Sequence, residues 1–321
     1  MLYPLTFDPI MKDRLWGGKK LQRLFNKPSK TNTTGESWEL SGVQGDVSVV
    51  NNGSLAGATL NDLLEKHAEA LMGKSVVERF GTEFPILIKF IDAKQDLSIQ
   101  LHPNDDLAKA RHDSFGKTEM WHVMDAEPGA RLIVGFNKNV SQEEYVKSLE
   151  DDTLMDLMNF EEVKPGDTFF INTGKIHAIG AGVLLAEIQQ TSDITYRVFD
   201  FNRKDKEGNL RELHTEQALD AIDYQKKDDF KVAYDKIENK ANPMVDCPYF
   251  KTNFLNLDGE MELSASVRDS FTILMCISGK AMVHNQNGSA AVQQGQTVLV
   301  PACSKSIQIA TKGAKLLEVT I

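Results

Sequence analysis

The stretch that decides the fold is VKPGDTFFINTGKIH, residues 163–177, together with its echo VQQGQTVLVPACSKS at residues 292–306. In both stretches a glycine is followed six positions later by Asn172 or Pro301, with an apolar run between. Turn residues on either side of a short apolar run predict a strand–turn–strand unit that is used twice. His177 in the first copy corresponds to Ser306 in the second. If His177 binds a metal, the second copy has lost this ligand, and we expect the second copy to have a structural role.

Short strand-like segments surround the first copy, and Gly, Asn and Asp separate them. This pattern is typical of a β-sandwich or barrel and argues against a doubly wound α/β fold. Helical periodicity is confined to three places, where we expect inserted helices: residues 59–80, 141–158 and 214–222. The expected strands include residues 85–93, 97–103, 120–126, 130–136, 167–173 and 183–190.

The composition changes after Tyr234. Residues 235–250 are polar, contain two prolines and lack periodicity, so they read as a connection. Residues 251–321 are almost entirely strand-like, and such a length is sufficient for a small all-β unit. We therefore expect two regions, residues 1–240 and residues 241–321.

Charge and composition exclude several classes of protein. The 321 residues carry 36 Lys and Arg against 46 Asp and Glu, a net charge of −10, which argues against a nucleic-acid partner. An anionic substrate would need a local cluster of cations. No apolar run reaches the roughly 18 residues of a membrane span, and the N-terminal residues do not resemble a signal peptide. The three cysteines lack zinc-site spacing and read as buried, reduced thiols, so we expect a cytoplasmic protein.

Four residues could form a metal site. Alternation along a strand puts Gln100 and His102 on one face, Glu119 starts another strand, and His177 follows a glycine turn. Two imidazoles, a carboxylate and an amide oxygen suit Zn²⁺ and leave a position for water or substrate. Taken singly, each histidine is more often a turn, surface or core residue. His122 should face away from Glu119, and the histidines read as non-ligands are His67, His112, His214 and His284.

Several motifs occur in one order and resemble those of a known family. The glycine turn before His177 resembles the second motif of cupin barrels, with Asn172 where many cupins have proline. The other segments resemble the signature of the type I mannose-6-phosphate isomerases, in their compact bacterial form: LWGG at 15–18, GESWE at 35–39, SIQLHPND at 98–105, GKTEMW at 116–121 and TYRVFD at 195–200. The resemblance implies a mainly β fold of cupin (jelly-roll) barrels with helical insertions. Residues 1–240 would be the catalytic metal-binding region, and residues 241–321 a cupin-like β domain without ligands.

The resemblance also implies roles for individual residues. One Zn²⁺ per chain would be held by Gln100, His102, Glu119 and His177. Arg197 would be catalytic, and the residues near the substrate would be Trp16, Glu36 and Arg203. From the residues alone, a structural ion pair of Arg197 with Asp200 or Asp193 is the better interpretation.

Lys117 lies two residues before Glu119 and should face the same side. Beside a divalent cation its pKa should be depressed, which makes it a candidate acid, base or phosphate contact. The alternative is a solvated lysine at a strand edge.

The implied activity is the zinc-dependent interconversion of mannose 6-phosphate and fructose 6-phosphate through an enediolate, by a monomer or homodimer. Two other classes remain open. One is another cupin metalloenzyme, either a dioxygenase or a different sugar-phosphate isomerase. The other is a non-catalytic sugar-binding cupin, which should lack ligands.

Overall fold

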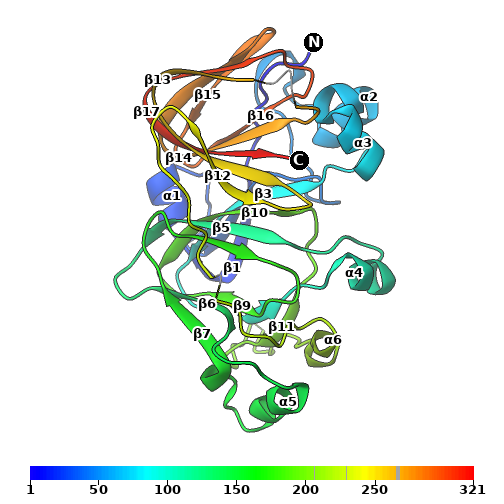
Figure 1. Cartoon of the computed structure of the whole chain (residues 1–321), viewed down its shortest axis with the longest axis vertical. Helices are drawn as coiled ribbons and strands as arrows, with labels where there is room; N and C mark the ends of the chain where they lie inside the picture. The colour runs from blue at the N-terminus through cyan, green and yellow to red at the C-terminus, as the bar shows by residue number, and fades with distance from the viewer. Residues whose placement is uncertain (206, 229, 265–267) are drawn as a thin grey trace.

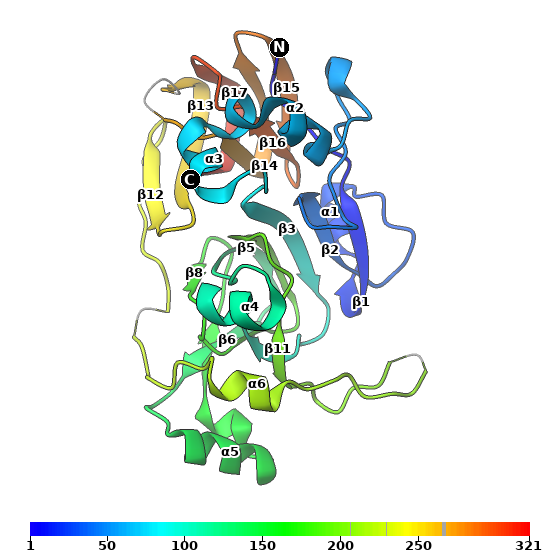
Figure 2. The ribbon, with the colours of Figure 1, turned by 90° about the vertical axis from the view of Figure 1, so that its right-hand side faces the viewer.

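Three antiparallel sheets build the molecule, as shown by a computed structural model that describes residues 1–205, 207–228, 230–264 and 268–321 (Figures 1 and 2). The central sheet has the order β1(Ile10–Gly18), β2(Thr34–Leu40), β3(Ile86–Ala93), β10(Val183–Gln190), β5(Glu119–Ala126), β8(Thr168–Ile171). The small sheet has the order β11(Tyr196–Phe199), β4(Ile99–Leu101), β9(His177–Ile179), β6(Arg131–Phe136), β7(Met158–Glu162). The C-terminal sheet has the order β12(Ala241–Asp246), β13(Lys251–Leu263), β17(Ile307–Thr320), β14(Thr272–Asn285), β15(Gly288–Gln293), and β16(Thr297–Val300) also pairs with β14.

The central sheet is the middle layer and is buried on both faces. One face packs on the small sheet, with Trp121 and Leu185 against Leu132. The other packs on the C-terminal sheet, with Phe90 against a core that includes Ile273. Burial on both faces explains why β3 and β10 read as nearly continuous apolar runs rather than as alternating ones.

The repeated unit is confirmed. Gly166 has φ +92° and leads into β8, and Gly295 has φ +80° and leads into β16, so both copies use the left-handed conformation that glycine allows. The expected strands are likewise present, although β4 is shorter than the apolar stretch around it.

The helices differ from the expected ones in their bounds. Residues 59–80 form two helices, α2(Leu60–Met72) and α3(Lys74–Phe80), because Gly73 has φ +99° and no room for a Cβ, which would lie 2.3 Å from the carbonyl oxygen of Asp269. Residues 141–158 form α5(Gln142–Glu150), followed by a short 3₁₀ turn and β7. The third helix is α6(Thr215–Leu219), and it covers the outer face of the small sheet together with α5 (Figure 2).

Three elements were not expected. The helices α1(Lys20–Phe25) and α4(Asp105–His112) are short; α4 is mostly polar, whereas α1 buries Leu21 and Phe25. The side chain of Asn104 caps α4 by accepting a hydrogen bond from the amide of Leu107. The third is β12, which lies within the polar stretch 235–250. The interpretation of that whole stretch as a connection was wrong, because pairing with β13 makes residues 241–246 a strand.

Residues at the N-terminus pack on the C-terminal sheet. Leu5 and Leu299 exchange two backbone hydrogen bonds of 2.8 Å. The carbonyl of Leu2 accepts bonds from the side-chain amides of Asn285, at 3.3 Å, and Asn287, at 2.8 Å. The division at residue 240 stays a prediction, because residues from both sides of it share one core.

The cysteines are free, but they are not all buried: Cys276 is buried, Cys247 is partly buried and Cys303 is exposed. No helix in the described part of the chain has the length and apolarity needed to cross a bilayer.

Candidate active site

Three potential metal ligands converge between the central and the small sheet. His102 follows β4, Glu119 opens β5 and His177 opens β9, and each is at most 1% exposed. Their ligand atoms all lie within 4.8 Å of one another. Nε2 of His102 is 3.2 Å from Oε1 of Glu119, and Nε2 of His177 is 3.9 Å from Oε2. The fold therefore joins residues that are far apart in the sequence.

The protonation states of these side chains suit a cation. Nδ1 of His102 lies 2.8 Å from the carbonyl of Ile194, and Nδ1 of His177 lies 2.7 Å from that of Lys175. A carbonyl oxygen can only accept, so each Nδ1–H donates a hydrogen bond to it and each Nε2 presents its lone pair to the cluster. Burial lowers the pKa of His102 and lowers that of His177 to about 3, so both imidazoles are neutral.

The carboxylate completes the fit. Burial alone would raise the pKa of Glu119, but Lys117 and the two imidazoles hold it well below its ordinary range. Both oxygens of Glu119 and both Nε2 atoms are buried without a hydrogen-bond partner. Unpartnered buried acceptors are costly. A divalent cation bound among these four atoms would satisfy them, so the residues fit a metal.

Gln100 lies directly beside this cluster. In the small sheet it is paired with His177 on β9 and with Arg197 on β11, and cross-strand partners point to the same face. Its neighbours Ile99 and Leu101 point into the opposite core, as the alternation predicts.

The glycine turn that presents His177 forms despite the departure from the family pattern. Gly174 has φ +80° and donates its amide to the carbonyl of His102 at 2.8 Å. A Cβ there would lie 2.6 Å from the carbonyl oxygen of Ala221. The carbonyl of Asn172 accepts from Lys175, so a residue other than proline supports the turn.

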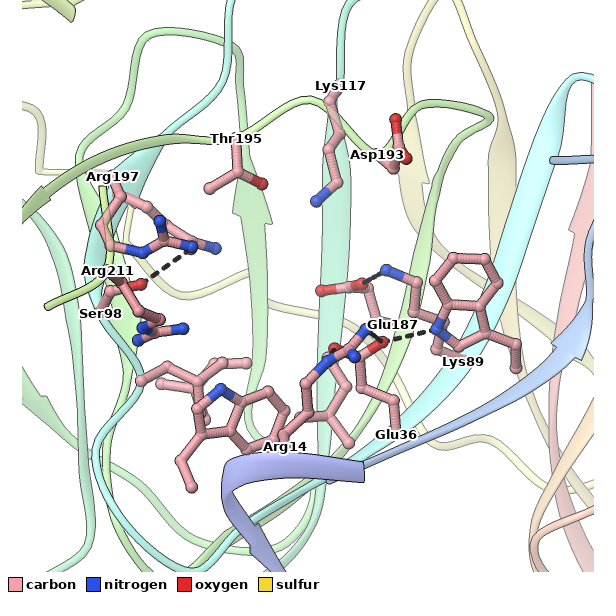
Figure 3. A pocket seen from close by; sticks show the side chains of 16 residues that line it. Arg14, Glu36, Lys89, Ser98, Lys117, Glu187, Asp193, Thr195, Arg197 and Arg211 are labelled. Atoms are coloured by element: carbon pink, nitrogen blue, oxygen red, sulfur yellow. Dashed lines mark hydrogen bonds and ion pairs between the residues drawn. The ribbon is translucent and has the colours of Figure 1, made fainter. Parts of the chain in front are cut away.

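A pocket of about 330 Å³ adjoins the three ligands, none of which belongs to its wall, and Figure 3 shows the side chains that line it. Gln100 and Lys117 belong to its wall, and Nζ of Lys117 lies 3.0 Å from Oε1 of Glu119, which links the wall to the buried cluster. The other charged and polar residues of the wall are Arg14, Glu36, Lys89, Ser98, Glu187, Asp193, Thr195, Arg197 and Arg211. The wall thus holds five cationic side chains and three acidic ones, within a chain whose net charge is −10.

Arg197 differs from the other cations of the wall. Arg14 pairs with Glu36 at 2.8 Å, and Lys89 pairs with Glu187 at 3.1 Å. Arg197 instead donates to the backbone carbonyl of Glu212 at 2.8 Å, its Nε has no partner, and it forms no ion pair with the described residues.

The alternative of an ion pair between Arg197 and Asp200 or Asp193 is therefore wrong. Asp200 is bound by two other arginines, Arg203 and Arg211. Among the described residues, Arg197 therefore lines the pocket without an ion-pair partner.

The other expected substrate contacts divide into two groups. Trp16 and Glu36 line the pocket. Burial would raise the pKa of Glu36, but the charges of Lys89 and Arg14 lower it to about 2. Arg203 is not part of the wall: it binds Asp200 and the carbonyl of Asp96. The substrate-binding role of all three stays a prediction.

The carboxylates around Lys117 act on its pKa. Burial would lower this pKa, but the charges of Glu119, Glu187 and Glu36 raise it. The lowering that a bound divalent cation would cause stays a prediction.

Sequence reasoning missed much of the wall, including Arg14, Lys89, Glu187, Thr195 and Arg211. Lys89 and Glu187 did leave a signal, because each is a charged residue inside an apolar strand, and they are cross-strand partners. His122 faces away from Glu119 as expected and bonds Thr168 at 2.9 Å. None of the other histidines in the described residues joins the cluster.

Known proteins resemble the chain in both regions. Residues 5–127 match the model "Phosphomannose isomerase type I, catalytic domain", and residues 239–319 match "Mannose-6-phosphate isomerase, cupin domain". Mannose-6-phosphate isomerase ManA of Bacillus subtilis is 36% identical over 301 residues, which are 93% of each chain. The mannose-6-phosphate isomerase of Streptococcus mutans is 33% identical over 309 residues, which are 96% of this chain and 95% of that one.

Solved structures agree with the sequence relatives. The crystal structure of mannose 6-phosphate isomerase from Bacillus subtilis aligns over 100% of both chains, with a TM-score of 0.89 and 30% identity. The expected fold class, mainly β with a cupin domain, is confirmed by this match and by the three antiparallel sheets. The chain therefore belongs to the type I mannose-6-phosphate isomerase family.

Proposed function

We propose that the chain interconverts mannose 6-phosphate and fructose 6-phosphate with one Zn²⁺ ion, held by His102, Glu119, His177 and Gln100. The observation that carries the proposal is a buried cluster of two imidazoles and a carboxylate beside a pocket whose wall contains Arg197, which forms no ion pair with the described residues. A metal site next to this cation suits a substrate that has both adjacent oxygens and a negative charge. The names of the relatives agree with such a substrate.

The donor set supports zinc as the metal. Two neutral imidazoles and one carboxylate are frequent ligands of catalytic Zn²⁺, and the amide oxygen of Gln100 would complete the set. When bound, the ion would act as a Lewis acid on the two sugar oxygens that exchange hydrogen positions.

The residues of the wall would stabilise negative charge. Isomerisation removes a proton next to a carbonyl, and the resulting enediolate carries charge on oxygen. Nε of Arg197 has no hydrogen-bond partner among the described residues and could donate to that oxygen or to the phosphate group, and a guanidinium stays charged in any environment. Arg211 and Lys117 enter the same pocket, so the anion would meet three cations (Figure 3).

Two groups of the wall suit proton transfer. Nζ of Lys117 lies 3.0 Å from Glu119, and this ammonium group would act as a proton donor. Burial and the charge of Glu119 raise the pKa of Glu187, which brings its titration closer to neutral pH. Its Oε2 accepts a bond from the indole of Trp121 at 2.9 Å, and its Oε1 lies against Lys89. We therefore include Glu187, which the sequence argument did not consider, among the candidate bases.

The test measures metal content and turnover together. Purified protein is assayed with mannose 6-phosphate in a coupled assay, as isolated, after chelation and after Zn²⁺ is restored. We expect activity to disappear on chelation and to return with zinc. Glu119→Gln and His177→Ala should each lower zinc content and reduce turnover at least 100-fold, since either removes a ligand. The matched control is His284→Ala, a partly exposed histidine on β14, which should keep both.

Two results would contradict the proposal. Absence of fructose 6-phosphate in the presence of bound zinc would exclude the isomerase and favour another cupin reaction, for which oxygen consumption is the first assay. Full turnover by Glu119→Gln would show that the metal cluster is not the active site.

A further inference from the structure

We infer that Tyr249, in the C-terminal region, is a positioning residue that acts through Asp105 and Gln190 on the loop formed by residues 116–118. This loop carries Lys117 to the pocket and leads into Glu119. The kinetic part of the inference rests on the proposed function, whereas its structural part does not.

Asp105 holds the start of the loop. It is the first residue of α4 and lies three positions after His102. Its Oδ1 accepts a bond of 2.8 Å from the amide of Gly116 and one of 3.1 Å from Nε2 of Gln190. One carboxylate oxygen therefore fixes the loop and a side chain of β10 together.

Gln190 holds the other side of the loop. Oε1 of the Gln190 side chain accepts a hydrogen bond from the backbone amide of Thr118 at 2.8 Å. The backbone amide of Gln190 donates to the backbone carbonyl of Thr118 at 3.1 Å. Lys117 is thus anchored at the residue before it and at the residue after it. Gly116 is also pressed against the start of α4, because a Cβ there would lie 2.8 Å from the amide nitrogen of Asp105.

Tyr249 connects this network to the C-terminal sheet. It lies in the turn between β12 and β13, and its hydroxyl donates to Oδ2 of Asp105 at 2.6 Å. Arg79 of α3 bonds the carbonyl of Pro248 and lies 5.8 Å from the Tyr249 ring. Arg79 therefore supports the turn and the ring of Tyr249, and the hydroxyl of Tyr249 orients the Asp105 carboxylate. Partial burial and Asp105 raise the pKa of Tyr249 to about 12, so the hydroxyl keeps its proton.

The position of the loop determines the geometry at the cluster. Nζ of Lys117 lies 3.0 Å from Oε1 of Glu119, and both side chains are buried. A small displacement of the loop changes this distance and the orientation of the carboxylate toward the two imidazoles. Supporting residues of this kind affect metal affinity and rate without touching substrate.

The test compares two tyrosines. Tyr249→Phe removes only the hydroxyl that bonds Asp105. The control, Tyr234→Phe, removes a hydroxyl that donates to the carbonyl of Gly166, also at 2.6 Å, and does not touch the loop. Amide hydrogen exchange is followed at Gly116 and Thr118, and Zn²⁺ affinity is measured by competition with a chromogenic chelator.

We expect Tyr249→Phe to speed exchange at Gly116 and Thr118 and to weaken Zn²⁺ binding, each by about 3- to 10-fold, the effect of losing one hydrogen bond. Turnover should fall by a similar factor, with KM changed by less than about 2-fold, because no substrate contact is lost. Tyr234→Phe should leave all of these values within about 2-fold of the wild type.

A second pair of variants concerns Asp105. Asp105→Asn keeps an acceptor for Gly116 and can donate to the Tyr249 hydroxyl, so it should stay within about 3-fold of the wild type in exchange and turnover. Asp105→Ala removes the side-chain hydrogen bonds to Gly116, Gln190 and Tyr249. It should therefore change exchange and turnover more than Tyr249→Phe does.

The inference is overturned if exchange at Gly116 and Thr118 is the same in Tyr249→Phe as in Tyr234→Phe, whatever the activity. Failure of the wild type to isomerise mannose 6-phosphate would instead refute the proposed function, and the exchange measurement would still decide the role of Tyr249.

Discussion

Arg197, Arg203 and Arg211 lie close enough for their charges to interact, and they are not equivalent. Arg203 and Arg211 both bind Asp200, which is buried at 6% exposure. Arg211 also lines the pocket, whereas Arg203 does not. Arg197 lines the pocket without any carboxylate partner among the residues described. Binding of an anion should therefore depend on Arg197 and Arg211.

The shared partner allows a matched comparison of Arg211 with Arg203. Arg211→Ala and Arg203→Ala each remove a cation from Asp200, so their structural cost should be similar. A charge-assisted hydrogen bond to substrate is worth about 1.5–3 kcal/mol, so Arg211→Ala should raise KM for the sugar phosphate by about 10- to 100-fold. Arg203→Ala should change KM by less than about 3-fold. Steady-state kinetics decide between them, and equal increases in KM would contradict the assignment.

The predictability of site residues from sequence depended on local signals. His102 and Gln100 share a face because strand residues alternate, and Glu119 and His177 stand at strand starts that the motifs mark. Arg14 and Arg211 carry no such signal. They reach the pocket only because strands and loops distant in the sequence meet there, which no local pattern encodes.

At the level of elements, the start of α4 and the loop before β5 form one packed unit. Gly116 permits this packing, since a Cβ would lie 2.8 Å from the backbone nitrogen of Asp105 and 2.9 Å from the carbonyl carbon of Asn104. Backbone atoms cannot rotate aside as a side chain can, so the loop itself would have to move.

Gly116→Ala should therefore affect both stability and activity. We expect a loss of about 1–3 kcal/mol in the free energy of unfolding, the usual cost of overpacking, and a clear fall in turnover because Lys117 is displaced. The control is Gly57→Ala. A Cβ at Gly57 would have nothing within 4 Å, but the backbone there has a φ of +91°. It should lose about 1 kcal/mol from backbone strain and keep its turnover. Denaturant titration and kinetics on the same preparations test this, and wild-type turnover in Gly116→Ala would contradict it.

Strands and helices were predictable from sequence where the apolar pattern of the segment itself indicates them. The apolar runs of β3 and β10 indicated their strands almost to the residue. The break between α2 and α3 was not visible, since the apolar pattern does not reveal that Gly73 adopts a non-helical φ of +99°. The helix α4 escaped notice because it buries only Ala108 and so shows no apolar periodicity.

At the scale of the whole molecule, His122 lies where the central sheet meets the C-terminal sheet. Its ring centroid is 6.3 Å from those of Tyr234 and Phe254, and it is 3% exposed. Burial, with Lys236 nearby, lowers its pKa to about 4. The folded protein thus keeps this imidazole neutral where the unfolded chain, with a pKa near 6.5, takes up a proton.

Acidification should therefore destabilise the molecule through His122. Below pH 6.5 the unfolded state binds the additional proton, so stability falls with pH until about pH 4, by about 3 kcal/mol in total. His122→Gln removes this titration, so its free energy of unfolding should depend less steeply on pH between 6.5 and 4 than that of the wild type. Urea titrations at several pH values measure both slopes, and identical slopes would contradict the assignment.

The attachment of Leu2 to Asn285 and Asn287 has a consequence for how the molecule is made. These hydrogen bonds span 283 and 285 positions of the chain. A ribosome releases Leu2 long before it translates the two asparagines that hold it, so these bonds cannot form during most of synthesis. Contacts of such long range slow folding and expose partly folded chains to aggregation. We therefore expect the junction between the N-terminal residues and the C-terminal sheet to form last, and nascent chains to depend on chaperones until it does.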